Sequence, residues 1–310
     1  MADSRRCAGE CSGQLFPLCT ARRYPMRPLD CIAAAVMVLC AFSAAHAGIN
    51  DDLVSAARDG SIEGVRSALS AGAPVDARNG EGLTALMAAS GAGNSDIIKL
   101  LIARKADVNL KDAYGRTALM MAAESGSVDA VRALFIAGAG VNARDINGMS
   151  PLMRIAEYGP VNVAEFLVKV GAHVDARDGH GATPLMAAAG AGQADMVKFL
   201  LNHNASVNAA DDDGWTPLLK ASYAGHAGVA ALLLGAGART NARITLADSY
   251  GVTALMLASL NGHAAVVKLL LAHGADVNVR DNLGQTALTK AVQYGNAEAV
   301  ILLRAAGGKE

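Results

Sequence analysis

The tetrapeptide TALM at residues 84–87 occurs again at 117–120 and at 253–256. Four close variants complete the series: SPLM at 150–153, TPLM at 183–186, TPLL at 216–219 and TALT at 286–289. A glycine stands two residues before each copy, at Gly82, Gly115, Gly148, Gly181, Gly214, Gly251 and Gly284. Successive glycines are 33 residues apart, except for one step of 37 between Gly214 and Gly251. This spacing indicates a repeat architecture.

The tetrapeptide predicts the start of a short helix. Its Thr or Ser is a typical N-cap residue, whose hydroxyl accepts a hydrogen bond from an early backbone N–H. Proline follows at the first helical position, where its missing N–H costs nothing, in three copies: Pro151, Pro184 and Pro217. A glycine, which adopts the left-handed conformation without a Cβ penalty, ends each helix: Gly93, Gly126, Gly159, Gly192, Gly225, Gly262 and Gly295.

A second helix follows in every unit. Its apolar residues have helical spacing, as at Val266, Leu269 and Leu270. It usually ends at another glycine or an asparagine, at Gly138, Gly171, Asn204, Gly237 and Gly274, with Lys105 as the exception. A V-N/D-x-x-D segment then leads to the next leading glycine. One unit of this size cannot bury its apolar face alone, so the units must stack.

The unit GVTALMLASLNGHAAVVKLLLAHGADVNVRD at 251–281 resembles an ankyrin repeat. The family pattern is G-x-T-P-L-H-x-A-A-x-x-G-H, followed by V-x-x-L-L-x-x-G-A-x-V-N. The resemblance covers about residues 50–307. It implies an all-α ankyrin-repeat solenoid of stacked helix-turn-helix units with short β-hairpin fingers. It also implies a binding role for the fingers and inner helices.

The pattern divides the chain into three parts. Residues 1–47 form a leader, and residues 48–81 form a degenerate N-terminal capping repeat that lacks the tetrapeptide. Residues 82–310 hold seven ankyrin repeats, which start near 82, 115, 148, 181, 214, 251 and 284.

The leader has the features of a secretory signal peptide. A short basic start from Met26 precedes the apolar run CIAAAVMVLCAF at 31–42, and Ala45-His46-Ala47 fits a cleavage site. We expect translation to begin at Met26, cleavage after Ala47, and a periplasmic or secreted bacterial protein. The apolar run is too short to span a bilayer, so we expect no membrane association of the mature form.

Other interpretations of the leader stay open. It could be a buried apolar helix or a disordered tail of a cytosolic effector or scaffold. Arg22-Arg23 could belong to a twin-arginine signal, and Cys40 could carry a lipid anchor. All five cysteines, Cys7, Cys11, Cys19, Cys31 and Cys40, lie in this segment, so the repeats have no disulfide framework and no thiolate site.

Methionine occupies the tetrapeptide position where the family has histidine, in the series Met87, Met120, Met153, Met186, Leu219, Met256 and Thr289. A methionine series in an exported protein suggests copper. However, packed helices lie about 8–10 Å apart, and the sulfurs of successive units would not reach one ion. We interpret the series as apolar packing between units and expect no metal and no cofactor.

An aspartate series precedes the leading glycines, at Asp112, Asp145, Asp178, Asp211, Asp248 and Asp281. The same spacing argues against a shared calcium or catalytic site, and we expect each carboxylate to cap its own turn. No nucleophile–base pattern, P-loop, GxGxxG or HExxH motif occurs, so we expect no enzyme. The formal net charge of −1 provides no strong field for nucleic acid.

The family resemblance places partner-binding positions beside the leading glycine and just before the helix-ending glycine. Aromatic residues occupy these positions at Tyr114, Tyr158, Trp215, Tyr223, Tyr250 and Tyr294. Amphipathic aromatics on an exposed face are typical interface anchors, and we add Arg116, His180 and Asp213 to the predicted set. The alternative is that these rings pack on neighbouring fingers, as is common in the family. Phe135, Phe166 and Phe199 fall on second helices, in predicted core positions.

The step of 37 residues marks a four-residue insertion in ARITLADSYG at 242–251. We expect Ile244 and Leu246 to be exposed on a longer finger and to contribute to partner binding. A tolerated insertion without a role is equally open. The predicted function is a non-catalytic, monomeric scaffold, accessory protein or inhibitor that binds a protein partner through the concave groove. The alternative is an exported metal- or small-molecule-handling protein that uses the Met and His content.

Overall fold

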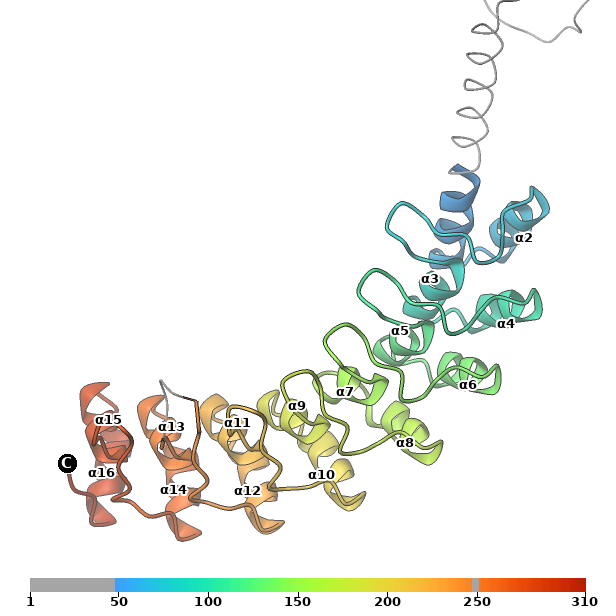
Figure 1. Ribbon diagram of the computed structural model, residues 1–310. Coiled ribbons are helices and arrows are strands. Elements are labelled where there is room, and N and C mark those ends of the chain that lie inside the picture. The colour runs from blue at the N-terminus through green and yellow to red at the C-terminus, as the bar shows by residue number, and fades with distance from the viewer. Residues whose placement is uncertain (1–47, 247–250) are drawn as a thin grey trace, which may run out of the picture. The chain divides into compact units, whose positions relative to one another are not determined.

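The computed structural model describes residues 48–246 and 251–310. These residues form pairs of helices that follow one another in chain order (Figure 1). None of the helices in these two ranges has the length and hydrophobicity that crossing a bilayer requires. The leader with its five cysteines lies outside the described residues, as do Asp248 and Tyr250.

Each repeat contributes a first and a second helix. The first helices are α3 (Ala85–Gly91), α5 (Ala118–Glu124), α7 (Pro151–Ala156), α9 (Pro184–Gly190), α11 (Pro217–Ala224), α13 (Ala254–Leu260) and α15 (Ala287–Gln293). The second helices are α4 (Ser95–Ala103), α6 (Val128–Ile136), α8 (Val161–Lys169), α10 (Ala194–Asn202), α12 (Ala227–Gly235), α14 (Ala264–Ala272) and α16 (Ala297–Ala305). A helix described over residues 48–58 and α2 (Ile62–Ser70) precede them. First helices pack on first helices and second on second, which confirms the predicted all-α solenoid.

The tetrapeptide begins each first helix, as predicted. Thr84 Oγ1 accepts a hydrogen bond of 3.3 Å from the backbone N–H of Met87. The equivalent Thr or Ser caps the other six first helices in the same way. The remaining tetrapeptide residues are buried, since Ala85, Leu86 and Met87 are each at most 1% exposed. The motif therefore recurs because it supplies both the cap and the packing surface of every repeat.

The methionine series lies in the packed interior. Met87, Met120, Met153, Met186 and Met256 are at most 2% exposed, and Leu219 is fully buried. This confirms the packing interpretation of these positions. Thr289 instead forms a reciprocal capping pair with Thr286 at the start of α15.

Positive backbone φ angles end nearly every helix. The first helices end at glycines with φ between 71° and 80°, except at Gly159. Gly159 differs because it precedes Pro160, whose ring restricts the preceding residue to extended conformations. At the ends of second helices, Lys105 (φ 70°) and Asn204 (φ 62°) adopt the conformation that glycine has in other repeats.

In four repeats the Asn of the V-N/D segment joins its repeat to the next, a role that the sequence analysis did not anticipate. Asn142 donates through Nδ2 to the carbonyl of Gly171 and accepts from the N–H of His173, both at 2.9 Å. The same pair of bonds is made by Asn109, Asn208 and Asn278. These bonds fix the spacing of successive repeats at the ends of the second helices.

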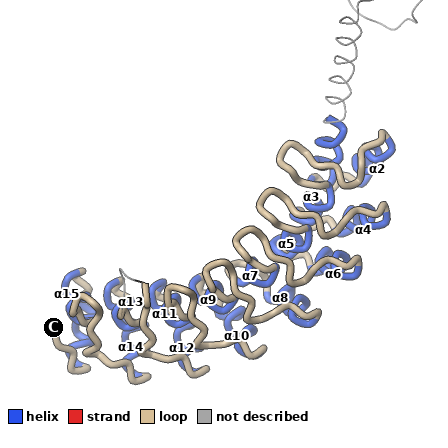
Figure 2. Tube along the Cα trace, in the orientation of Figure 1, coloured by secondary structure: helices blue, strands red, loops and turns tan. Residues whose placement is uncertain are grey.

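The fingers are loops that project from the helices (Figure 2). Among the described residues they contain single backbone bridges rather than strands, between Arg78 and Thr84, Lys111 and Thr117, and Arg243 and Thr253. The predicted β-hairpins are therefore reduced to bridged turns, because each finger is short. Neighbouring fingers are also linked by backbone bonds, such as that from the Ile146 N–H to the Tyr114 carbonyl (3.1 Å).

Replacing Lys105 with glycine should stabilise the protein. A non-glycine residue in the left-handed conformation costs about 1–2 kcal/mol, whereas glycine costs about 0.5–1 kcal/mol in backbone entropy. We therefore expect Lys105→Gly to increase the free energy of unfolding by about 0.5–1 kcal/mol in urea denaturation. Asn204→Gly is the matched control and should gain less, because asparagine tolerates this conformation. A lower stability of Lys105→Gly would contradict the backbone argument.

Candidate functional site

The predicted partner-binding tyrosines that the structure describes are exposed. The side chains of Tyr114, Tyr158, Tyr223 and Tyr294 are 61%, 77%, 53% and 59% exposed, respectively. Tyr114 lies in a finger, and the others lie at or just after the ends of first helices. We call the surface formed by the fingers and the exposed positions of the first helices the finger face.

Trp215 is half-buried and packs against the core of the stack. Its ring meets the ring of Tyr223 edge-on, with centroids 5.8 Å apart and an interplanar angle of 83°. The Lys220 ammonium lies 4.7 Å from the indole centroid. Trp215 therefore packs against the core and contacts Tyr223 and Lys220 of its own repeat, and its role in partner binding stays a prediction.

The charged members of the predicted set lie in or beside the fingers. The Arg116 guanidinium is 5.4 Å from the Tyr114 ring centroid, in a cation–π arrangement. His180 and Asp213 are exposed. The carbonyl of Asp213 accepts the N–H of Thr245 at 2.8 Å, which joins its finger to the one with the insertion.

Ile244 is buried, with 1% exposure, so its prediction as an exposed binding residue is wrong. Its N–H bonds to the Val252 carbonyl and its carbonyl accepts from Gly251. Asp112 makes the same two backbone bonds, with Arg116 and Gly115. Ile244 therefore takes the buried position of the aspartate series, and the four additional residues fall between it and Gly251. Leu246 is 43% exposed, as predicted.

The aspartates cap their own turns, as predicted, at every described position of the series. Asp145 Oδ1 accepts the backbone N–H groups of Asn147 (2.8 Å) and Met149 (2.9 Å). The same pair of bonds is present at Asp112, Asp178, Asp211 and Asp281. In the first repeat Asn79 makes the equivalent bonds through its amide oxygen.

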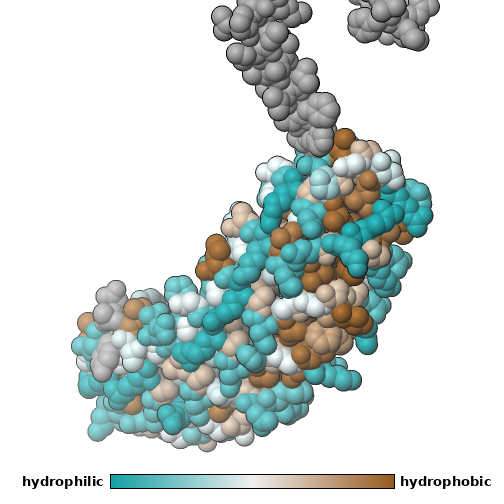
Figure 3. All heavy atoms as spheres, turned by 45° about the vertical axis from the view of Figure 1, so that its right-hand side comes forward, coloured by the Kyte–Doolittle hydropathy of each residue, from teal (hydrophilic) through white to brown (hydrophobic). Residues whose placement is uncertain are grey.

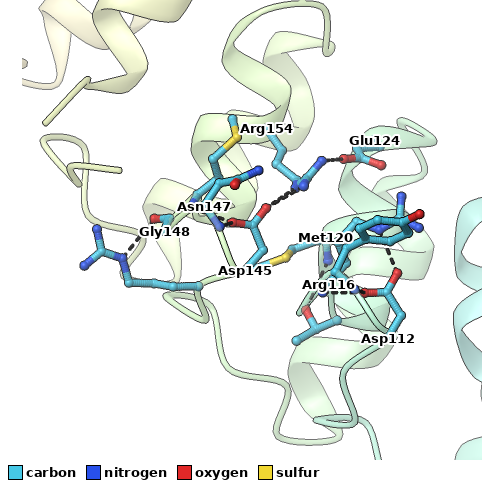
Figure 4. A network of polar contacts seen from close by, with 12 residues as sticks. Asp112, Arg116, Met120, Glu124, Asp145, Asn147, Gly148 and Arg154 are labelled. Atoms are coloured by element: carbon cyan, nitrogen blue, oxygen red, sulfur yellow. Dashed lines mark hydrogen bonds and ion pairs between the residues drawn. The ribbon is translucent and has the colours of Figure 1, made fainter. Parts of the chain in front are cut away.

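The second carboxylate oxygen binds a basic side chain in four repeats. The pairs are Arg116 with Asp112 (2.8 Å), Arg154 with Asp145 (3.0 Å), Lys220 with Asp211 (3.3 Å) and Lys290 with Asp281 (2.7 Å). Arg154, Lys220 and Lys290 each stand six residues after a leading glycine. This regularity in the sequence could have revealed the pairing. Arg154 also reaches Glu124 of the preceding repeat at 2.8 Å and so bridges two repeats (Figure 4).

Burial and charge have opposite effects on the pKa values of these pairs. Burial lowers the pKa of Arg154, but its hydrogen bonds to Asp145 and Glu124 and their negative charges raise it in sum. Burial raises the pKa of Asp281, but the hydrogen bond and charge of Lys290 and the N–H groups of the turn lower it in sum. Both side chains are therefore held in their charged forms.

Asp178 lacks such a cation among the described residues. Its Oδ1 accepts the N–H groups of His180 and Ala182, both at 2.9 Å. The two positions that supply cations in other repeats are alanines here, Ala182 and Ala187. An open pocket of about 230 Å³ lies at this place. Its larger lining residues are Met149, Met153, Glu157, Asp178, Met186 and Lys220.

A second surface lies over the second helices of the early repeats, where Figure 3 shows a gathering of hydrophobic residues. An open pocket of about 620 Å³ between α4 and α6 is lined by Ile102 and by Ile136, which is 76% exposed. Phe135 and Phe166 are half-buried and meet edge-on, with centroids 6.0 Å apart. The predicted core position is confirmed for Phe199, which is buried. Phe166 is only partly buried but packs against the core, and Phe135 is partly buried.

The histidines after the helix-ending glycines bind backbone carbonyls of the preceding repeat. His226 Nε2 lies 3.0 Å from the Gly190 carbonyl, and His263 Nε2 lies 3.1 Å from that of Tyr223. Within residues 48–246 and 251–310, no group of three or more His, Cys, Asp or Glu side chains is arranged to hold a metal ion. These histidines therefore have structural partners.

Comparisons with known proteins agree with the repeat architecture. A family model described as ankyrin repeats (3 copies) matches residues 53–145, 152–244 and 241–309. A comparison with curated proteins found no match.

Replacing Lys290 with methionine should weaken the protein at neutral pH more than at acid pH. The lowered pKa of Asp281 means that its charged form contributes stability above the unfolded-state pKa of about 3.9. This contribution is lost as the pH falls through the folded-state pKa. Without Lys290, the pKa of Asp281 is lowered less, so the charged Asp281 contributes less to the free energy of unfolding.

We expect the difference in unfolding free energy between wild type and Lys290→Met to be largest near neutrality and to shrink below about pH 4, measured by urea denaturation at several pH values. The exposed Lys268 provides the control substitution Lys268→Met, which should show no such dependence. A difference that stays constant with pH would show that Asp281 does not depend on Lys290.

Proposed function

The chain belongs to the ankyrin repeat family, and from this premise we propose that it is a non-catalytic scaffold, accessory protein or inhibitor that binds a protein partner through its finger face. A fixed stack of helix pairs presents side chains at set spacing. Few backbone segments and side chains then have to become ordered on binding, and this small entropy cost favours affinity. We propose that the chain acts as a monomer.

The observation that carries this proposal is the exposure of four tyrosines on the finger face. Tyr114, Tyr158, Tyr223 and Tyr294 are each more than half exposed. Tyrosine offers a large apolar ring and a polar hydroxyl at low conformational cost and is enriched among residues that dominate interface energies. The four side chains come from four different repeats, so a partner could contact several repeats at once.

The alternative, an exported metal- or small-molecule-handling protein, has less support. The sulfurs that it would use belong to Met87, Met120, Met153, Met186 and Met256, and these side chains are at most 2% exposed. One soft metal ion could bind several of these sulfurs only if the packed repeats separated.

Export rests on the leader sequence alone, which predicts cleavage after Ala47. We expect the protein from fractionated cells to begin at Gly48 and to occur in the periplasm or medium. N-terminal sequencing of each fraction tests this. A cytosolic, uncleaved chain that begins at Met1 would overturn the proposed localisation.

Replacing Tyr158 and Tyr223 together with alanine should abolish partner binding and leave the fold intact. Both rings are exposed, so helicity and Tm should change little, whereas loss of two interface anchors should weaken binding at least about tenfold. The measurement is capture of partners from a periplasmic extract, followed by titration of the captured protein.

The matched control is Ile136→Ala with Ile301→Ala, which removes two exposed side chains from the second helices. This variant should bind like the wild type. If it loses the partner while Tyr158→Ala/Tyr223→Ala keeps it, the binding surface lies on the second helices and the proposal is wrong.

A further inference from the structure

We propose that the pocket beside Asp178 binds a basic side chain, lysine or arginine, of the protein partner. The inference rests on the proposed function and adds the chemistry that the finger face would recognise. It is carried by a comparison of Asp178 with the other described aspartates of the series, by the volume and lining of the pocket, and by its charge.

The other repeats show what this carboxylate position binds. Asp112, Asp145, Asp211 and Asp281 each use one oxygen to cap the turn and the other to bind an Arg or Lys that follows four or nine residues later in the chain. Asp178 makes the same capping bonds, so its carboxylate has the same orientation relative to the turn. Its second oxygen therefore occupies a position at which this protein elsewhere binds a cation.

The repeat itself leaves room for a cation from outside. Ala182 and Ala187 occupy the two positions from which the other repeats supply Arg or Lys. Gly190 and Ala191 also line the pocket and add no bulk at the end of α9. The resulting space of about 230 Å³ is smaller than typical small-molecule sites of about 300–1,000 Å³. It suits a single long side chain.

The pocket lining matches both parts of such a side chain. The partly exposed Met149 provides adaptable apolar surface for an aliphatic stem, and the nearly buried Met153 and Met186 line the base of the pocket. Asp178 and Glu157 provide negative charge for the head group. Lys220 also lines the pocket, but its ammonium is paired with Asp211 and lies over the Trp215 ring. The charge that is left for a ligand is therefore negative.

Two exposed tyrosines, Tyr158 and Tyr223, lie close in sequence to residues that line this pocket. Tyr158 follows Glu157, which also lines the pocket, and the carboxylate of Glu157 raises the pKa of the Tyr158 phenol by a hydrogen bond and by its charge. Tyr223 lies in the next repeat, in the same helix as Lys220. A basic residue of a partner could therefore enter the pocket while its neighbours contact Tyr158 and Tyr223.

The first test introduces a lysine at position 187. This position corresponds to that of Arg154, Lys220 and Lys290 in the other repeats. Ala187→Lys should raise Tm by about 2–4 °C relative to Ala187→Met, a neutral side chain of comparable length. This gain should disappear when Asp178 is replaced by asparagine. Asp178→Asn should still fold, because Asn79 makes the two capping bonds in the first repeat. The proposal would be wrong if Ala187→Lys did not have a higher Tm than Ala187→Met, or if the same rise in Tm were measured when Asp178 is replaced by asparagine.

A direct test uses the three methionine methyl groups that line the pocket as reporters. The protein with ¹³C-methyl methionine is titrated with Nα-acetyl-lysine methylamide and with the neutral Nα-acetyl-norleucine methylamide. We expect the lysine probe to shift the signals of Met149, Met153 and Met186, and these shifts to be lost in Asp178→Asn and in Ala187→Lys. Equal shifts with both probes, or shifts unchanged in Asp178→Asn, would overturn the proposal.

The two tests separate this inference from the proposed function. If the wild type captures a partner through Tyr158 and Tyr223 but the lysine probe shifts none of the three signals, the function stands and the inference is wrong. If the probe shifts the signals but no partner binds the finger face, the pocket binds cations and the proposed function is wrong.

Discussion

The burial of each repeat's apolar side by its neighbours is the constraint on which the structure depends. Leu86, Leu119 and Leu152 are at most 1% exposed, and the first helices that carry them pack both on the first helices of adjacent repeats and on the second helix of their own repeat. A single unit has no such cover, so its cap, helix ends and asparagine links are useful only within a stack. The side chains that can contact a partner are therefore those of the fingers and of the exposed helix positions.

The aspartate series connects the fold with the candidate site. One carboxylate oxygen fixes the turn of the finger, and the other is available to a cation. In most described repeats the cation is internal, and the finger face at that point is closed by the chain's own Arg or Lys. At Asp178 the same geometry is left open to a ligand.

Most of the fold could be predicted from the sequence, because the period, the caps and the glycines are local signals. The burial of Ile244 was missed because the sequence alone aligns Asp248 with the aspartate series, whereas backbone bonds put Ile244 at that position. The exposure of the tyrosines followed from their repeat positions, but the half-burial of Trp215 depends on Lys220 and Tyr223. The pocket was missed because two alanines carry no signal until the cations of other repeats are placed.

Hydrogen exchange of Leu185→Ala tests the central claim, nearest-neighbour stacking, most directly. Leu185 is fully buried in α9, and its truncation should cost about 2.7–5 kcal/mol. The account predicts the largest loss of amide protection in α9 and α10, a smaller loss in α7, α8, α11 and α12, and little change in α3 and α16. An equal loss in every repeat, or a loss confined to α9 and α10 with none in their neighbours, would contradict it.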